Sequence, residues 1–261
     1  MTAPSQAAIE LYRSALLDPE LRALRENYCR VTVGALRSVA GWLGMDSCLG
    51  GGDLTFGQLA DGHDEERFVA FRGAASVIEM ANELAAGALA LIDQDLRYAS
   101  SAMIRQLIET EYLLAAFALE FSRAADWARA TPEEIRKGFS PKAMRAVGGF
   151  SNREYWRHCD MGGHPAPSAR PLLRFNLAAS PADDEFLSAS VWGDLAQHLR
   201  RLWQAIDSLL CDQHARYAEV RSDERESVEQ AEEQWSAADP LAQPVDFALL
   251  DGLLDIEDDG S

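Results

Sequence analysis

Two long stretches rich in alanine and leucine, residues 68–93 and 98–127, constrain the fold of this chain more than any other feature. Apolar residues in both stretches recur at intervals of three and four, which is the spacing of one face of an α-helix. These residues are Val77, Met80, Ala81, Leu84, Ala88 and Leu91 in the first stretch, and Met103, Leu107, Leu113, Leu114, Phe117 and Phe121 in the second. We find no alternating strand pattern elsewhere in the chain. The sequence therefore predicts an all-α fold with these two helices at its core.

Local start and stop signals place the other helices. Thr131 stands directly before a proline and two acidic residues, which is a typical helix start. Ser151 and Glu154 have the spacing of a capping box, so a helix should begin there and continue to the glycines at 162 and 163. Further helices are predicted over residues 5–46, as two helices with the second starting at Pro19, and over residues 132–146 and 183–221; loops are predicted at residues 50–66 and 165–182.

The acidic residues are concentrated at one end of the chain. The net charge is −18, and residues 222–261 hold 13 acidic residues and one arginine, a net charge of −12. This composition predicts a disordered acidic tail. We therefore divide the chain into an N-terminal helical extension and loop (1–66), a helical bundle (67–221) and the tail (222–261).

Cysteine spacing and hydropathy bear on the compartment. Cysteines 29, 48, 159 and 211 lie far apart, with no CxxC pair and no signal-like apolar segment near the start. Charged residues such as Glu79 and Glu83 interrupt the most hydrophobic region. We expect a cytoplasmic protein that is not embedded in a membrane.

Residues 157–165, Arg-His-Cys-Asp-Met-Gly-Gly-His-Pro, hold the densest set of reactive side chains. A histidine with a pKa near neutrality can take the proton of a ribose 2′-hydroxyl or protonate a leaving oxygen, and an arginine can hold a phosphate. The surrounding segment, residues 136–174, has eight basic and two acidic residues, a net charge of +6, which suits a polyanion. A solvated, arginine-rich helix face is the alternative interpretation.

Arg157, a following polar residue (His158) and His164 after a six-residue gap resemble the signature of the HEPN superfamily of small helical-bundle proteins. Many members of this superfamily are RNases of toxin and antiphage systems. The resemblance implies a HEPN-like helical bundle that forms a homodimer. Arg157 and His164 would share one face of a regular helix, so antiparallel pairing of two copies would bring the arginine of one to the histidine of the other.

A second resemblance covers about residues 70–210. Arg105 and Glu109 in a hydrophobic helix, followed by Tyr155 and His164-Pro165, resemble a group of uncharacterised bacterial helical proteins related to abortive-infection proteins. The resemblance implies that Arg105, Glu109 and Tyr155 support the site around His164. Cys159 departs from that pattern, in which a serine is expected.

Plainer interpretations remain open for the same residues. Arg105 and Glu109 also have the spacing of an ordinary salt bridge within one helix, and His164 could be a structural histidine at a helix end. A zinc site made from His158, Cys159 and His164 would lack a fourth ligand and matches no recurrent zinc spacing. We therefore predict no metal and no cofactor.

The sequence leads to two functional hypotheses. The first is a metal-independent endoribonuclease or RNA-binding protein of a bacterial stress or antiphage system, with His164 as acid–base residue, Arg157 as phosphate holder, and Arg105, Glu109, Tyr155 and His158 in support. The second is a non-catalytic interaction module that docks a protein partner through residues 222–261, where apolar residues 247–254 interrupt the acidic ones.

Overall fold

A computed structural model describes residues 6–49, 65–165, 167–173, 181–214 and 216–242. All regular structure within these ranges is helical, which confirms the all-α prediction. The α-helices are α1 (Gln6–Leu17), α2 (Pro19–Leu49), α4 (Glu65–Asp93), α5 (Arg97–Leu119), α6 (Ser122–Arg129), α7 (Pro132–Gly138), α8 (Pro141–Gly148), α9 (Asn152–His158), α10 (Pro181–Gln213), α11 (Tyr217–Val220) and α12 (Ser222–Ala238). Residues 50–64 of the loop predicted at 50–66, and residues 166 and 174–180 of the loop predicted at 165–182, lie outside the described residues. Glu65 and Glu66, predicted as loop, form the first turn of α4.

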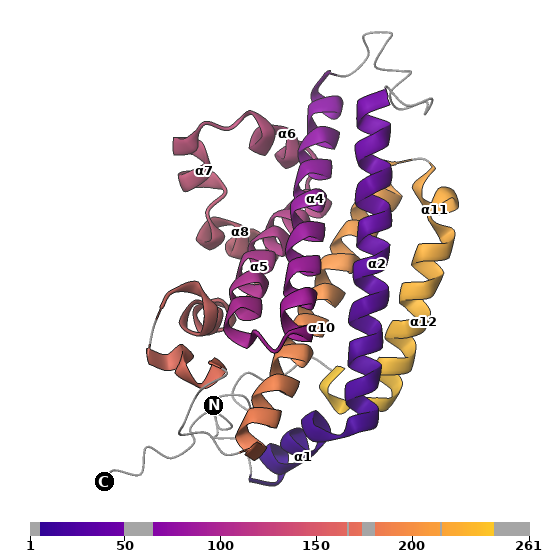
Figure 1. The fold of residues 1–261 in the computed structure, drawn as a ribbon. Helices are drawn as coiled ribbons and strands as arrows, with labels where there is room; N and C mark the ends of the chain where they lie inside the picture. Colours follow the sequence, from indigo (N-terminus) through magenta and orange to yellow (C-terminus); the bar gives the residue numbers. More distant parts are fainter. Residues whose placement is uncertain (1–5, 50–64, 166, 174–180, 215, 243–261) are drawn as a thin grey trace.

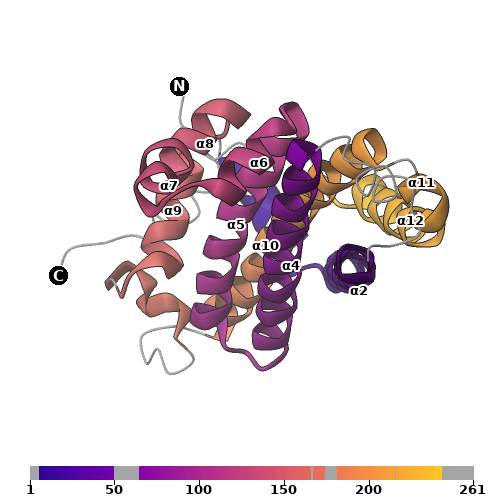
Figure 2. The same ribbon diagram turned by 90° about the horizontal axis from the view of Figure 1, so that it is seen from above.

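Long helices form the centre of the molecule. α4 packs against α2, α5 and α6, and α10 packs against α5 and α2. Small, fully buried residues on α4, among them Ala81, Ala85 and Ala88, let neighbouring backbones approach closely. α7 and α8 lie on one side of this bundle, and α11 and α12 lie on the opposite side, beyond α2 (Figure 1). Figure 2 shows the same arrangement from above.

The predicted capping signals mark helix starts, but three predicted helices are divided. The helix predicted over residues 183–221 is interrupted, because α10 ends at Gln213 and α11 begins at Tyr217. Thr131 caps α7 in a complete capping box with Glu134, as expected. Residues 98–127 are not one helix, because α5 ends at Leu119 and α6 begins at Ser122. The helix predicted over residues 132–146 is also split, because Ser140 caps a new helix with Pro141 in its first turn.

The prediction of a disordered tail over residues 222–261 is wrong for residues 222–242. These residues form α12 and a short 3-10 turn that pack against α2 and α1. Val228, Ala231 and Trp235 are buried and belong to the same hydrophobic core as residues of α2, α4, α5 and α10. The N-terminal helices and α12 are thus parts of one packed body with the central bundle. The apolar segment 247–254 lies outside the described residues.

A buried ion pair joins the two ends of the described chain. The Nε atom of Arg25 on α2 donates to Asp239 Oδ2 over 2.5 Å, and both side chains are completely buried. Arg25 also donates to the carbonyl oxygens of Ala15 and Leu16 near the end of α1. Trp235 Nε1 donates to the same carboxylate over 2.9 Å. One arginine therefore fixes α1, α2 and α12 to one another.

α4 is long and apolar enough to cross a membrane, with a mean hydropathy of 1.4 over 18 residues. The core helices of helical bundles share this property. In the structure, α4 packs its buried residues against α2, α5 and α6.

Asp239→Ala should lower the free energy of unfolding by about 3–5 kcal/mol, because it leaves the Arg25 charge buried without a partner. Urea denaturation followed by circular dichroism would measure the loss. The exposed Glu229 on α12 supplies the control, since Glu229→Ala removes one charge from the same helix without burying another. Equal stability of the two variants would contradict a stabilising role for the Arg25–Asp239 ion pair.

Candidate functional site

α9 begins as the sequence predicts but completes its cap differently. The Ser151 side chain accepts hydrogen bonds from the backbone amides of Arg153 and Glu154, at 3.2 and 3.4 Å. The Glu154 side chain does not return to the cap; it is buried and bonds to Arg201 of α10 instead. Glu154, the predicted capping-box residue, therefore forms a buried ion pair with α10 instead of completing the cap.

After His158 the helix widens into a π turn, Cys159–Gly163, before the chain becomes extended at His164. A β-carbon at Gly162 would lie 2.5 Å from the carbonyl carbon of Ser101 and 2.7 Å from the amide nitrogen of Ala102, so only glycine permits this approach to α5. Such π turns occur often at functional sites. The wider turn changes the register between Arg157 and His164, so the common face expected from regular α geometry does not apply.

Arg157 and His164 are the two residues predicted to carry the chemistry. His164 is exposed. Arg157 is partly buried, and its charge acts on Tyr12 of α1 and on Asp194 of α10. Among the residues that the structure describes, no hydrogen bond or ion pair joins Arg157 to His164 within one chain.

The predicted supporting residues Arg105, Glu109 and Tyr155 do come together. Arg105 Nη1 lies 2.5 Å from Glu109 Oε1, and Arg105 Nη2 donates to the Tyr155 hydroxyl over 2.7 Å. The Tyr155 hydroxyl in turn donates to Glu109 over 3.3 Å. Burial raises the pKa of Tyr155 to about 12 despite the opposing charge of Arg105, so the phenol stays neutral near pH 7. A β-carbon added at Gly163 would lie 3.5 Å from Arg105 Nε. This cluster therefore packs against the residue that precedes His164.

Only some of the basic residues in segment 136–174 contribute to an exposed surface. Arg145 is buried, with its guanidinium carbon 3.9 Å from the centre of the Tyr155 ring. Lys137 pairs with Glu133, and Arg174 lies outside the described residues. Arg136, Lys137, Lys142, Arg153 and Arg170 are exposed.

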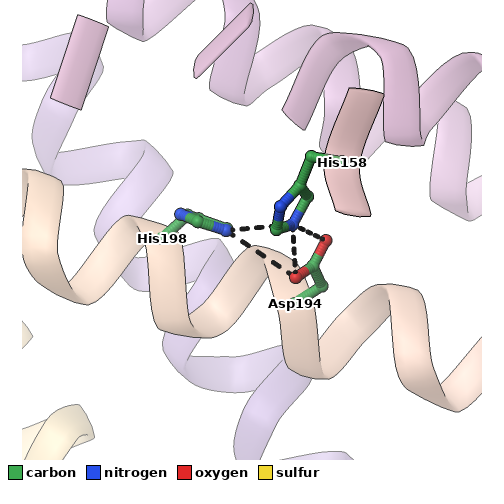
Figure 3. Close-up of side chains that lie close together, drawn as sticks. All are labelled: His158, Asp194 and His198. Carbon is green, nitrogen blue, oxygen red and sulfur yellow. Dashed lines mark hydrogen bonds and ion pairs between the residues drawn. The ribbon is translucent and has the colours of Figure 1, made fainter. Parts of the chain in front are cut away.

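His158, predicted only as a supporting residue, lies at the centre of a buried polar cluster. Its Nε2 atom is 2.9 and 3.0 Å from the two carboxylate oxygens of Asp194 and 3.2 Å from Nε2 of His198. Asp194 and His198 are one turn apart on α10, and both point at the His158 ring (Figure 3). His198 Nε2 lies 3.7 Å from Asp194 Oδ1. We call His158, Asp194 and His198 the triad.

The far nitrogen of each imidazole has its own partner. His158 Nδ1 lies 2.7 Å from the backbone carbonyl oxygen of Glu154, and His198 Nδ1 lies 2.8 Å from Glu111 Oε2. The carbonyl oxygen of Glu154 can only accept, so His158 Nδ1 carries a proton and donates it. His198 Nδ1 lies 2.8 Å from both Glu111 Oε2 and Arg201 Nη2. We assign the tautomer in which His198 Nδ1 donates to Glu111, and Arg201 Nη2 donates to Glu154. Both Nε2 atoms therefore face Asp194. Arg201 pairs with Glu111 at 2.8 Å and also with Glu154, which compensates these buried carboxylates.

The pKa values of His158 and Asp194 move apart. Burial opposes the charged form of His158, but the Asp194 carboxylate outweighs it and raises the pKa of His158. Burial likewise opposes ionisation of Asp194, yet the charge and hydrogen bond of His158 hold its pKa well below the usual range. Both shifts favour the ion pair of a protonated His158 and an ionised Asp194.

The grouping of His158 with Asp194 and His198 was missed at the level of sequence. The zinc set considered there was His158, Cys159 and His164; in the structure Cys159 lies against Gly163 and His164 is exposed, so that set is not assembled. The available signal was Asp194 and His198, four residues apart in an otherwise apolar stripe. The second signal was Glu111, an acidic residue among the buried positions of α5.

In comparisons with known proteins, no family model, no curated protein and no solved structure matches this chain. The HEPN-like resemblance therefore stays a prediction.

Glu111→Ala should destabilise the protein by about 3–5 kcal/mol, because Arg201 and His198 would lose their buried partner. Glu109→Ala, two residues earlier on α5, removes a partly exposed carboxylate and should cost about 1 kcal/mol. Chemical denaturation of both variants beside the wild type provides the measurement. A smaller loss for Glu111→Ala than for Glu109→Ala would show that the buried network does not stabilise the fold.

Proposed function

We propose that the protein binds single-stranded RNA across the outer face of α9 and cleaves it without a metal ion, with His164 as the acid–base residue. The observation that supports this proposal is an exposed aromatic and basic surface. Trp156 is 60% exposed, and it lies between Arg153, three residues earlier, and Arg157, one residue later. Aromatic rings on which bases stack, interleaved with cations that follow the phosphates, are typical of single-strand binding sites.

His164 follows this surface at the end of the π turn and supplies the acid–base group. Its imidazole would take the 2′-hydroxyl proton as that oxygen attacks the adjacent phosphorus. The bond from phosphorus to the 5′-oxygen would break, and the 5′-oxygen would take a proton from water, which leaves a 2′,3′-cyclic phosphate and a 5′-hydroxyl. Arg157 would hold the phosphate. Arg105, Glu109 and Tyr155 would act as positioning residues, because their cluster supports the backbone at Gly163.

A homodimer would complete this site. Among the described residues of one chain, His164 is exposed and Arg157 is half-buried, and no hydrogen bond or ion pair joins them. Pairing of two α9 surfaces would bring the arginine of one copy to the histidine of the other, as the HEPN resemblance implies. The proposed setting is bacterial stress or phage defence in the cytoplasm.

Wild-type protein should cleave tRNA or total RNA in EDTA, and His164→Ala and Arg157→Ala should each lower the rate about 100-fold or more. Arg129→Ala is the matched control, because it removes an exposed arginine from the end of α6 and should cleave normally. Gel analysis of the products gives the rates. Cleavage that survives in His164→Ala would refute the assigned role. No cleavage and no salt-sensitive RNA binding by the wild type would favour a protein-interaction module.

Trp156→Ala should weaken binding of a single-stranded oligonucleotide by about 1–3 kcal/mol, through loss of base stacking. Fluorescence anisotropy at several salt concentrations would measure the affinity, and its logarithm should fall linearly with the logarithm of salt concentration. Leu119→Ala, which removes an exposed apolar residue from α5, is the control. Equal affinities of the two variants would place the RNA elsewhere.

A further inference from the structure

We infer that His158, Asp194 and His198 form a binding site for a divalent transition-metal ion, with Zn²⁺ as the best-suited ion. The triad brings two imidazole nitrogens and a carboxylate oxygen from α9 and α10 to one point, with all three ligand atoms within 4.8 Å of one another (Figure 3). This inference is independent of RNA cleavage, because it uses the inner face of α9 rather than its exposed face.

The spacing of the three ligand atoms matches that of a coordination sphere. Two ligands about 2.0–2.1 Å from Zn²⁺ at a tetrahedral angle lie about 3.3–3.4 Å apart. In the triad the corresponding distances are 2.9 Å from His158 to Asp194, 3.2 Å from His158 to His198 and 3.7 Å from His198 to Asp194. Small side-chain adjustments would therefore admit an ion, with no change in the backbone.

The hydrogen bonds outside the triad are those that metal-binding histidines make. Such a histidine usually donates its second ring nitrogen to a carboxylate or a backbone carbonyl, which fixes the ring and turns the other nitrogen to the metal. His198 donates to the Glu111 carboxylate, and His158 donates to the carbonyl of Glu154. Both rings are thus held with Nε2 toward Asp194.

The charges of the cluster also call for a divalent cation. Glu111, Glu154 and Asp194 contribute −3 and Arg201 contributes +1, so the cluster has a net charge of −1 when His158 is protonated and −2 when both imidazoles are neutral, which is the form that binds a metal ion. Buried charge without compensation costs several kcal/mol per ion. One divalent ion brings the sum to zero. Arg157, which also acts on Asp194, is partly exposed, so solvent screens its charge.

The types of ligand select the class of ion. Two imidazoles and one carboxylate suit Zn²⁺ and other first-row transition metals, whereas Mg²⁺ and Ca²⁺ prefer oxygen ligands alone. The Asp194 side chain is 36% exposed, which gives an ion a path from solvent. Since the ligands come from two helices, the bound ion would clamp α9 to α10 and so fix the segment that leads to His164.

The test uses full-length protein, freed of metal with a chelator and then dialysed, and Zn²⁺ alone as the probe. Calorimetric titration should show one Zn²⁺ per chain, and thermal unfolding should show a higher Tm with Zn²⁺ than without. Mg²⁺ should produce neither effect. Co²⁺ in place of Zn²⁺ should give the strong visible absorption of a tetrahedral site.

Asp194→Asn and His198→Gln should each weaken Zn²⁺ binding by about 100-fold or more, and Glu111→Gln should weaken it by about 10–100-fold through the orientation of His198. Asp212→Asn, an exposed change on the same helix, is the matched control and should bind as the wild type does. Circular dichroism of the chelated proteins checks folding, and Asp194→Asn is the decisive variant because its side chain is partly exposed. Absence of Zn²⁺ binding by the wild type, or binding unchanged in Asp194→Asn, would overturn the inference.

Discussion

The fold depends on how one buried carboxylate, Glu111, is compensated. An isolated charge in the centre of a helical bundle would cost several kcal/mol. Glu111 instead contacts Arg201 and His198 of α10, and through His198 it is linked to His158 of α9. The same network therefore joins α5, α10 and α9. The position of α9 and of its exposed surface is therefore fixed by the contacts of His158 with the polar groups of α10.

The helices that could be predicted are those whose signals are local. Thr131 and Pro19 mark helix starts through capping and through the fixed backbone angle of proline, and both signals depend on adjacent residues only. α12 could not be recognised in this way, because its many acidic residues hide a narrow buried stripe that ends at Trp235. The partner that compensates Asp239 is Arg25, which is 214 residues away in the sequence.

The candidate site likewise has one part that the sequence predicted and one part that it did not. Arg105, Glu109 and Tyr155 were predicted from a motif, and the structure places them in contact. The triad was not predicted, because its members become neighbours only when α9 lies across α10. α9 thus has two chemically different faces. Its outer face presents Trp156 to solvent, while its inner face buries His158 directly before the π turn.

The position of α12 has a consequence for synthesis of the protein. Tyr28 and Arg25 on α2 are covered by residues near the end of the described chain, with Trp235 stacked 4.8 Å from the Tyr28 ring. A chain that is still being translated carries this face of α2 without its cover until Trp235 and Asp239, more than 200 residues further along the chain, have left the ribosome. Contacts between such distant residues form late and close a large loop. Until then, Tyr28 and Arg25 lack the ring and the carboxylate that cover them in the folded protein.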